Sequence, residues 1–140
     1  KQLETDYEQR GIELRQIVAK IAGDDCLRAI ANAIEAVVAE ANAEGLAKEA
    51  FAARYGGEEF AVVMPWISVT AYEELAARVV DSVRKLRIPH ERNEAWGIVT
   101  ASIGGSRREA SSGASVTVFR DADAALYRAK ENGRNRCELS

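Results

Sequence analysis

A short polar turn between two apolar runs carries the residue types in this chain that are best suited to chemistry. It is the segment 54–60, Arg-Tyr-Gly-Gly-Glu-Glu-Phe. The apolar runs on both sides and the glycine pair between them predict a β-hairpin. Gly56 and Gly57 lack a Cβ atom and would let a ligand approach the backbone closely. Glu58 and Glu59 follow at the mouth of the turn, where strand alternation is loose and both carboxylates can reach one polar site.

Such a carboxylate pair suits Mg²⁺. This ion typically takes one or two carboxylates and completes its octahedron with water and substrate phosphates. A structural alternative stays open, because the acids of an exposed hairpin can serve only to keep a sheet edge soluble.

A second group of candidate residues lies in the segment 130–136, Lys-Glu-Asn-Gly-Arg-Asn-Arg. Lys130 and Arg134 are four residues apart and share a face if a helix continues through them. Together they could hold a polyphosphate, Lys130 as a point charge and Arg134 as a two-pronged donor. The alternative needs no ligand, since cations at a helix C-terminus also complement the helix dipole.

Composition limits the class of protein. The chain has 140 residues, of which 47% are hydrophobic, as expected for one compact domain with a core. Its net charge of −3 argues against general binding of nucleic acid or anionic membranes. No apolar run approaches the roughly 20 residues that span a bilayer, and no signal peptide opens the chain. We therefore expect a cytoplasmic domain, which could belong to a membrane-anchored protein.

The cysteines and the histidine do not suggest a metal site. Cys26 and Cys137 have no metal-site spacing and are expected to be reduced thiols. His90 follows Pro89 among charged residues, and we expect it in a surface loop.

The spacing of apolar residues predicts the elements of the first half of the chain. Residues 1–21 are expected to form one broken helix or two short ones, interrupted at Gly11. Residues 26–43 predict a strongly amphipathic helix stopped by Gly45. The hairpin follows and should end at Pro65. The apolar face of the amphipathic helix consists of Leu27, Ile30, Ala31, Ile34, Val37 and Val38.

In the second half, Thr70 and Glu73 have capping-box spacing and predict the start of a helix. The residues expected on its buried side are Leu75, Val79, Val83 and Leu86. Residues 97–103 predict a strand ended by Gly104 and Gly105, and residues 106–115 a loop. Residues 118–130 predict a helix with Gly133 just past its end, and residues 136–139 a short edge strand. Alternating helices and strands indicate an α/β or α+β fold, a sheet covered by helices.

The segments 23–27, 54–60, 99–104 and 122–135 form four motifs that, in this order, resemble the GGDEF family, the diguanylate cyclase domains. The segment 54–60 is similar to the family signature in its glutamate form, and residues 23–27 resemble its G-D-x-x-L. Residues 99–104 resemble a family strand, and residues 122–135 its closing A-D-x-A-L-Y-x-A-K-x-x-G-R-N. The resemblance covers residues 22–140 and leaves 1–21 as a divergent or truncated helical segment. It implies a nucleotide-cyclase-like fold, with a central, mostly antiparallel sheet flanked by helices and an active site on the hairpin.

The resemblance also implies an activity in bacterial signal transduction. Family members condense two GTP into the second messenger cyclic di-GMP and release two pyrophosphates. Each subunit of a face-to-face homodimer holds one GTP with Mg²⁺ or Mn²⁺, and each 3′-hydroxyl attacks the α-phosphorus of the other nucleotide. A monomer should therefore be inactive, and the domain is expected to be fused to a sensor domain in a longer protein.

The resemblance implies a role for each hairpin residue that matches a position of the family motif. Gly56 and Gly57 would let the nucleotide lie against the hairpin. Glu58 would be a metal ligand, and Glu59 would assist at the metal or help to activate the hydroxyl.

Three further residues receive roles in the same way. Asp24 would hydrogen-bond the guanine edge, while Lys130 and Arg134 would hold the β- and γ-phosphates. With the phosphate charge neutralised, the remaining work is the alignment of two nucleotides for in-line displacement.

Two family features are not visible in the sequence. The first is a strand ending in D-x-D-x-F-K, which supplies a second metal carboxylate and is followed by a guanine-reading Asn and a Gly-His pair. Only residues 1–3, Lys-Gln-Leu, could be its remnant, so the chain is either cut or rearranged there or is a divergent member. A metal held by Glu58 and Glu59 alone would be bound more weakly. The second is the R-x-x-D site of product inhibition, replaced by Ala47 and Ala50, so we expect no inhibition there.

Three functions stay open. The intact Gly-Gly-Glu-Glu-Phe favours an active cyclase. The absent upstream carboxylates favour a receptor module that binds GTP or cyclic di-GMP without turnover. A purely structural dimerisation domain would gain no heat stability from guanine nucleotides, whereas a binder at 100 times its Kd gains about 2.7 kcal/mol.

Overall fold

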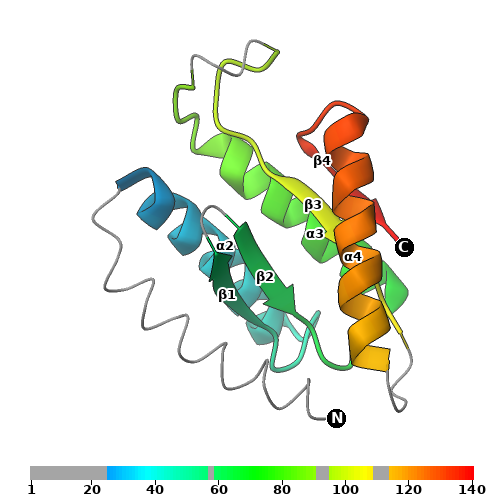
Figure 1. The fold of residues 1–140 in the computed structure, drawn as a ribbon. Helices are drawn as coiled ribbons and strands as arrows, with labels where there is room; N and C mark the ends of the chain where they lie inside the picture. The colour runs from blue at the N-terminus through cyan, green and yellow to red at the C-terminus, as the bar shows by residue number, and fades with distance from the viewer. Residues whose placement is uncertain (1–24, 57–58, 91–94, 109–113) are drawn as a thin grey trace. The chain divides into compact units, whose positions relative to one another are not determined.

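The computed structural model describes residues 25–56, 59–90, 95–108 and 114–140. These residues form helices α2, α3 and α4 and strands β1 to β4, in the order α2, β1, β2, α3, β3, α4, β4 (Figure 1). The mixture of helices and strands confirms the predicted fold class. The chain divides into two compact units: the first unit ends at Leu75 and the second unit begins at Ala76, so the division falls inside helix α3, Val69–Lys85.

Helix α2, Asp25–Glu44, confirms the helix predicted over 26–43. Four of the six residues of the predicted apolar face are buried together with Ala41, whereas Leu27 and Ile30 at the start of the helix are half-buried. The helix ends at the predicted stop, because Gly45 takes a φ of 80° and its N–H donates to the Asn42 carbonyl at 3.3 Å. The buried face comprises Ala31, Ile34, Val37, Val38 and Ala41.

The predicted hairpin is present. Strands β1, Phe51–Gly56, and β2, Glu59–Val63, pair antiparallel, with Phe51 opposite Val63 and Gly56 opposite Glu59. The register is irregular between Arg54 and Gly56, next to the turn. Strand β2 ends at Val63, two residues before the expected end at Pro65. Strand β1 packs on α2, and the buried Ala52 and Ala53 allow this close contact.

A side-chain clamp fixes the start of β1 to the end of α2. The Asn42 Nδ2 donates to the Ala50 carbonyl at 2.9 Å, and the Ala50 N–H donates to Asn42 Oδ1 at 3.0 Å. Ala50 is only 7% exposed, so both of its backbone polar groups are satisfied by one amide side chain. The clamp sets where the hairpin leaves the helix.

Replacing this amide should therefore destabilise the first unit. We expect Asn42→Ala to lower the free energy of unfolding by about 2 kcal/mol, since it leaves a buried donor and acceptor without their partner. Urea denaturation followed by circular dichroism measures the change. Asn32→Ala, on the exposed face of the same helix, is the matched control and should be neutral or slightly stabilising. Equal effects of the two substitutions would contradict the clamp.

Helix α3, Val69–Lys85, begins one residue earlier than the predicted capping box at Thr70 and Glu73. The predicted box was wrong: the N-cap is Ser68, whose Oγ accepts the Ala71 N–H at 3.1 Å. Leu75, Val79 and Val83 are buried as predicted. Leu86 is 37% exposed, contrary to prediction, because the helix ends before it at Lys85.

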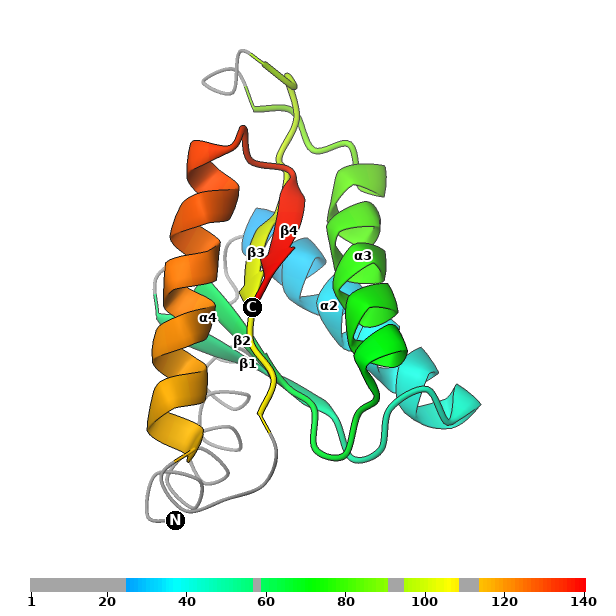
Figure 2. The same cartoon turned by 90° about the vertical axis from the view of Figure 1, so that its right-hand side faces the viewer.

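In the second unit, β3, Ser102–Gly105, pairs in parallel with β4, Arg136–Leu139. Strand β4 confirms the predicted edge strand at 136–139. The antiparallel pairing expected of the sheet holds for β1 and β2 but not for this pair, and the described strands form two separate two-stranded sheets. Helix α4, Ala114–Glu131, packs along β3 and β4 (Figure 2).

The strand predicted over 97–103 is shifted toward the C-terminus. Gly104 and Gly105, expected to end it, lie inside β3. The reason is packing against α4: a Cβ built on Gly104 would meet the Leu126 nitrogen at 2.0 Å and the Ala122 carbonyl at 2.2 Å. Only glycine lets this strand lie so close to the helix. Residues 97–101 contribute one isolated bridge, Ile98 opposite Pro89.

The loop predicted over 106–115 is also shorter than expected, because α4 begins at Ala114 rather than 118. Ser106 Oγ donates to the Val118 carbonyl at 2.7 Å, and Arg108 pairs with Asp121. These bonds join the end of β3 to the first turns of α4, which the sequence spacing did not indicate.

The remaining expectations concern single residues and the membrane. His90 is exposed in a loop as predicted, and Cys26 and Cys137 are both half-buried thiols. None of the helices in the part of the chain that the structure describes is long and apolar enough to cross a bilayer.

Candidate functional site

The hairpin presents part of the predicted carboxylate site. Gly56 is the last residue of β1 and pairs with Glu59, the first residue of β2. The Glu59 side chain is exposed at this point. Gly57 and Glu58 lie outside the described residues, as do Asp24 and the segment 1–21. The structure therefore fixes both ends of the turn, and the roles predicted for Gly57, Glu58 and Asp24 stay predictions.

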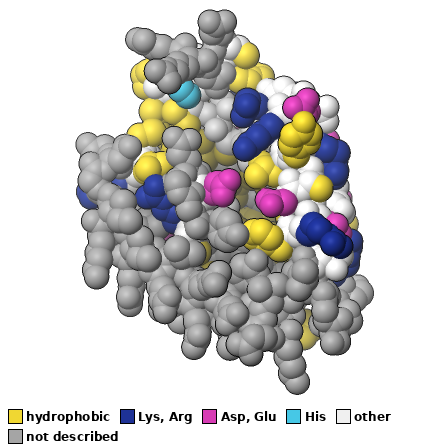
Figure 3. Space-filling view, in the orientation of Figure 1, with side chains coloured by type: hydrophobic (Ala, Val, Ile, Leu, Met, Phe, Trp, Pro, Cys, Tyr) yellow, Lys and Arg dark blue, Asp and Glu magenta, His cyan; other side chains and the backbone are white. Residues whose placement is uncertain are grey.

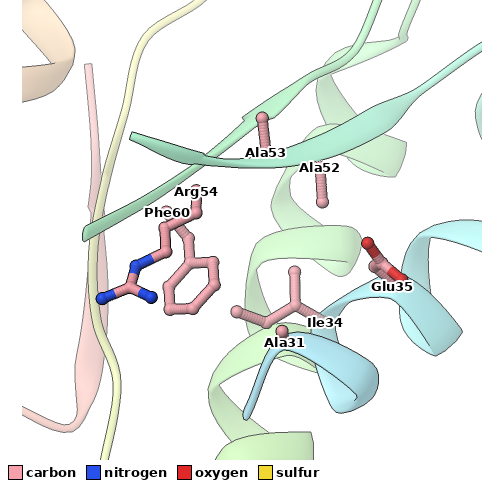
Figure 4. Close-up of a pocket in the computed structure, with 7 residues that line it drawn as sticks. All are labelled: Ala31, Ile34, Glu35, Ala52, Ala53, Arg54 and Phe60. Carbon is pink, nitrogen blue, oxygen red and sulfur yellow. The ribbon is translucent and has the colours of Figure 1, made fainter. Parts of the chain in front are cut away.

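A small hollow lies between the hairpin and α2 (Figure 4). In Figure 4 the Phe60 ring from β2 points toward Ala31 and Ile34 of α2. The hollow has a volume of about 10 Å³, enough for about one water molecule. It cannot take a nucleotide, so it belongs to the packing that seats the hairpin. Its lining residues are Ala31, Ile34, Glu35, Ala52, Ala53, Arg54 and Phe60.

Among the described residues there is no group of three or more His, Cys, Asp or Glu side chains that could hold a metal ion. Glu59 supplies one exposed carboxylate beside the turn, and its predicted partner Glu58 falls in the gap 57–58. The oxygen chemistry of the pair fits Mg²⁺, and the water-exposed position of Glu59 fits an ion that retains several waters.

The second group of candidate residues sits at the C-terminal end of α4. Lys130 is exposed in the last turn, and Arg134 is exposed just beyond it. The helix ends in a Schellman motif: the Arg134 N–H donates to the Ala129 carbonyl at 2.9 Å, and the Gly133 N–H to the Lys130 carbonyl at 3.5 Å. Gly133 has a φ of 117°, which confirms it as the residue just past the helix end.

This region is a mixed surface with more cations than anions. Figure 3 shows Lys and Arg side chains gathered over the C-terminal part of α4, with acidic side chains between them. The exposed cations there are Arg128, Lys130, Arg134 and Arg136. Two acids lie near them in this segment: Glu131 is exposed at the end of α4, and Glu138 accepts a hydrogen bond from Asn132 Nδ2 at 3.1 Å. The surface can attract an anionic group and offers several donors to it.

The structure brings the predicted site residues together in two sets. Gly56 and Glu59 face each other in the unit that ends at Leu75, and Lys130 and Arg134 flank one turn in the unit that begins at Ala76. Each set is positioned by its own local backbone geometry.

The positions of the missing inhibitory motif are part of the core. Ala47 is 3% and Ala50 is 7% exposed, and the Ala47 N–H donates to the Ala41 carbonyl at 3.1 Å. With the Asn42 clamp on Ala50, both residues serve to join α2 to β1.

Three residues that support these sets were missed by sequence reasoning. Asn42 and Gly104 carry no periodic signal, because Asn42 acts by hydrogen bonds to the backbone of Ala50 and Gly104 by its close approach to the backbone of α4. Arg136 lies inside the predicted cationic segment, but its hydrogen bond to the Arg134 carbonyl depends on a backbone turn that composition does not reveal.

Comparison with known proteins identifies the family. Residues 20–136 match the family described as diguanylate cyclase, GGDEF domain. The chain belongs to the GGDEF family, as its motifs predicted.

Curated relatives carry the same activity in their names. The chain is 36% identical over 119 residues to diguanylate cyclase A of Treponema denticola, covering 85% of this chain and 29% of that protein. It is 36% identical over 120 residues to the diguanylate cyclase DgcP of Pseudomonas aeruginosa, covering 86% of this chain and 16% of that one. The chain thus spans less than a third of the length of either relative.

Solved structures share the fold. The coiled coil and GGDEF domain of DgcB from Caulobacter crescentus, in complex with c-di-GMP, matches with a TM-score of 0.64 and 32% identity, over 84% of this chain and 58% of that one. The active GGEEF domain of a diguanylate cyclase from Vibrio cholerae also gives a TM-score of 0.64, at 28% identity, over 90% of this chain and 75% of that one.

Proposed function

We propose that this domain is a diguanylate cyclase that condenses two GTP into cyclic di-GMP across a homodimer. Each 3′-hydroxyl oxygen forms a bond to the α-phosphorus of the opposite GTP, the bond from that phosphorus to pyrophosphate breaks, and the hydroxyl proton is released. Two pyrophosphates leave for each cyclic product. The observation that carries the proposal is the closed Gly56–Glu59 hairpin, which carries the glutamate form of the family signature.

In this proposal, the residues of this chain bind the nucleotide and align it for the reaction. Gly56 and Gly57 let the nucleotide lie against the turn, and Asp24 hydrogen-bonds the guanine edge. Lys130 and Arg134 hold the β- and γ-phosphates from the end of α4. Because each half-site holds one nucleotide, catalysis needs two copies of the domain, and we expect a sensor domain in the longer protein to control their encounter.

Glu58 and Glu59 are the residues that would hold a Mg²⁺ or Mn²⁺ ion. When bound, the ion neutralises phosphate charge and favours the in-line geometry. Glu59 is exposed beside the turn, where its carboxylate is also available to accept the proton of the attacking hydroxyl.

A receptor for GTP or cyclic di-GMP is the second candidate function. It is supported by the similarity to the GGDEF domain of DgcB from Caulobacter crescentus, whose structure was solved in complex with c-di-GMP. Such a domain would bind guanine nucleotides without turnover.

Calorimetry and turnover separate these functions. The purified chain is titrated with GTP and, separately, with cyclic di-GMP. It is then incubated with GTP and Mg²⁺ at high protein concentration, and cyclic di-GMP is sought by chromatography. Product from the wild type supports the cyclase. Nucleotide binding without product supports the receptor, and no binding at all overturns both.

Product inhibition at residues 47–50 is not expected. A guanidinium and a carboxylate are needed there to grip cyclic di-GMP, and Ala47 and Ala50 are instead buried alanines. We expect added cyclic di-GMP to compete with GTP and to leave the maximal rate unchanged. Steady-state kinetics at several product concentrations measure this, and cyclic di-GMP bound around Ala47 to Ala50 would contradict it.

A further inference from the structure

The turn between α4 and β4 holds an unusual backbone conformation. Gly133, Arg134 and Asn135 have φ values of 117°, 64° and 49°. Glycine adopts positive φ without penalty and Asn tolerates it, but for Arg134 it is unfavourable. The surrounding structure must therefore hold Arg134 in this conformation.

On the helix side, the Schellman hydrogen bonds fix the amide of Arg134 to the carbonyl of Ala129. They leave the carbonyl of Arg134, on the other side of its Cα, to be held by something else. The two sides together decide the direction in which the Arg134 side chain leaves the backbone.

On the strand side, Arg136 supplies that second contact. Its Nε donates to the Arg134 carbonyl at 3.0 Å. Its Nη2 lies 2.9 Å from the point that a Cβ on Gly133 would occupy, so the guanidinium covers the glycine. Arg136 is also the first residue of β4, opposite Ser102 of β3. The contact thus ties the turn to a paired strand.

We propose that Arg136 is a positioning residue for Arg134. It holds the left-handed turn so that the Arg134 guanidinium is presented to the polyphosphate of the nucleotide. The inference rests on the proposed function for its ligand, whereas its geometric part concerns the turn alone. Arg136 acts through the conformation of Arg134, and its own charge is secondary.

The test combines a double-mutant cycle with a conservative variant. Binding of GTP is measured by calorimetry for the wild type, Arg136→Gln, Arg136→Lys, Arg134→Ala and the double variant Arg134→Ala with Arg136→Gln. Arg120→Gln, an exposed cation on α4, is the matched control for the loss of charge. In parallel, three-bond couplings between the amide and Hα protons report φ of Arg134 and Asn135 without nucleotide.

We expect Arg136→Gln and Arg136→Lys each to weaken GTP binding by about three- to tenfold, the range that one hydrogen bond supports. Arg120→Gln should change it by less than about twofold. In the Arg134→Ala background, Arg136→Gln should have no further effect, because the group that it positions is gone. In both Arg136 variants, the couplings should show that Arg134 and Asn135 no longer keep a positive φ.

Two results would overturn the inference alone. If the losses from Arg134→Ala and Arg136→Gln add, or if Arg136→Lys restores affinity, Arg136 acts through its charge. If the wild type binds no GTP, the proposed function fails instead, and unchanged couplings in Arg136→Gln then also overturn the positioning role.

Discussion

Lys130→Ala and Arg134→Ala should each weaken GTP binding by about ten- to a hundredfold, since a hydrogen bond to a charged group contributes about 1.5–3 kcal/mol. Both side chains are exposed at the end of α4, one in the last helical turn and the other just beyond it. If they hold the β- and γ-phosphates, GMP, which lacks both groups, should bind the variants and the wild type within about twofold of each other. Calorimetry with the two nucleotides measures the difference.

Arg120→Ala is the control for this comparison, because it removes one exposed cation from the same helix away from its C-terminus. A general electrostatic effect would weaken GTP binding in all three variants and would fade with salt. If Lys130→Ala and Arg134→Ala weaken the binding of GTP and GMP equally, the two residues do not contact the β- and γ-phosphates. Their charges would then only complement the dipole of α4.

Gly104→Ala should unfold the second unit or destabilise it by about 3 kcal/mol or more. The new Cβ would lie 2.0 Å from the Leu126 nitrogen, 2.2 Å from the Ala122 carbonyl oxygen and 2.5 Å from the Leu126 Cα. All three are backbone atoms of α4, so no side-chain rotation can relieve the overlap, and the helix must move away from β3. Thermal and urea denaturation followed by circular dichroism measure the loss.

Gly97→Ala separates this steric effect from backbone strain. Gly97 has a φ of 70°, but nothing lies within 4 Å of the Cβ position. Its replacement should cost only about 1 kcal/mol, the penalty for a left-handed residue. A Gly104→Ala protein as stable as the Gly97→Ala protein would contradict the close packing of β3 on α4.

Local sequence signals predicted the elements that are determined locally. The 26–43 helix, the hairpin, the Gly133 helix end and the 136–139 strand follow from periodicity, paired turn glycines and capping chemistry, and the structure contains all of them. The same signals located the two sets of candidate site residues, because a glycine turn with acids and a helix end with cations are both short contiguous patterns.

The errors arise where distant contacts override local pattern. The β-branched run 97–103 predicted a strand, yet the strand forms over Ser102–Gly105, where two glycines let it lie against α4. Thr70 and Glu73 had capping-box spacing, but the earlier Ser68 hydroxyl caps α3. Leu86 fitted the helical period, but the helix ends one residue before it.

Local sequence pattern also did not predict the residues that support the candidate site. Asn42 and Arg136 act by hydrogen bonds to backbone carbonyls, so their side-chain types alone do not indicate their partners. The family resemblance added three expectations that spacing alone did not give: that Asp24 binds guanine, that Lys130 and Arg134 hold the β- and γ-phosphates in particular, and that the active unit is a homodimer.

Turnover tests the central claim most directly. The purified wild type and Glu58→Gln are incubated with GTP and Mg²⁺ at high protein concentration, and cyclic di-GMP and pyrophosphate are quantified. We predict that the wild type forms two pyrophosphates for each cyclic di-GMP and that Glu58→Gln, with the isosteric amide in place of the carboxylate, forms neither. Binding of GTP without any product from the wild type would contradict the cyclase and leave a nucleotide receptor in its place.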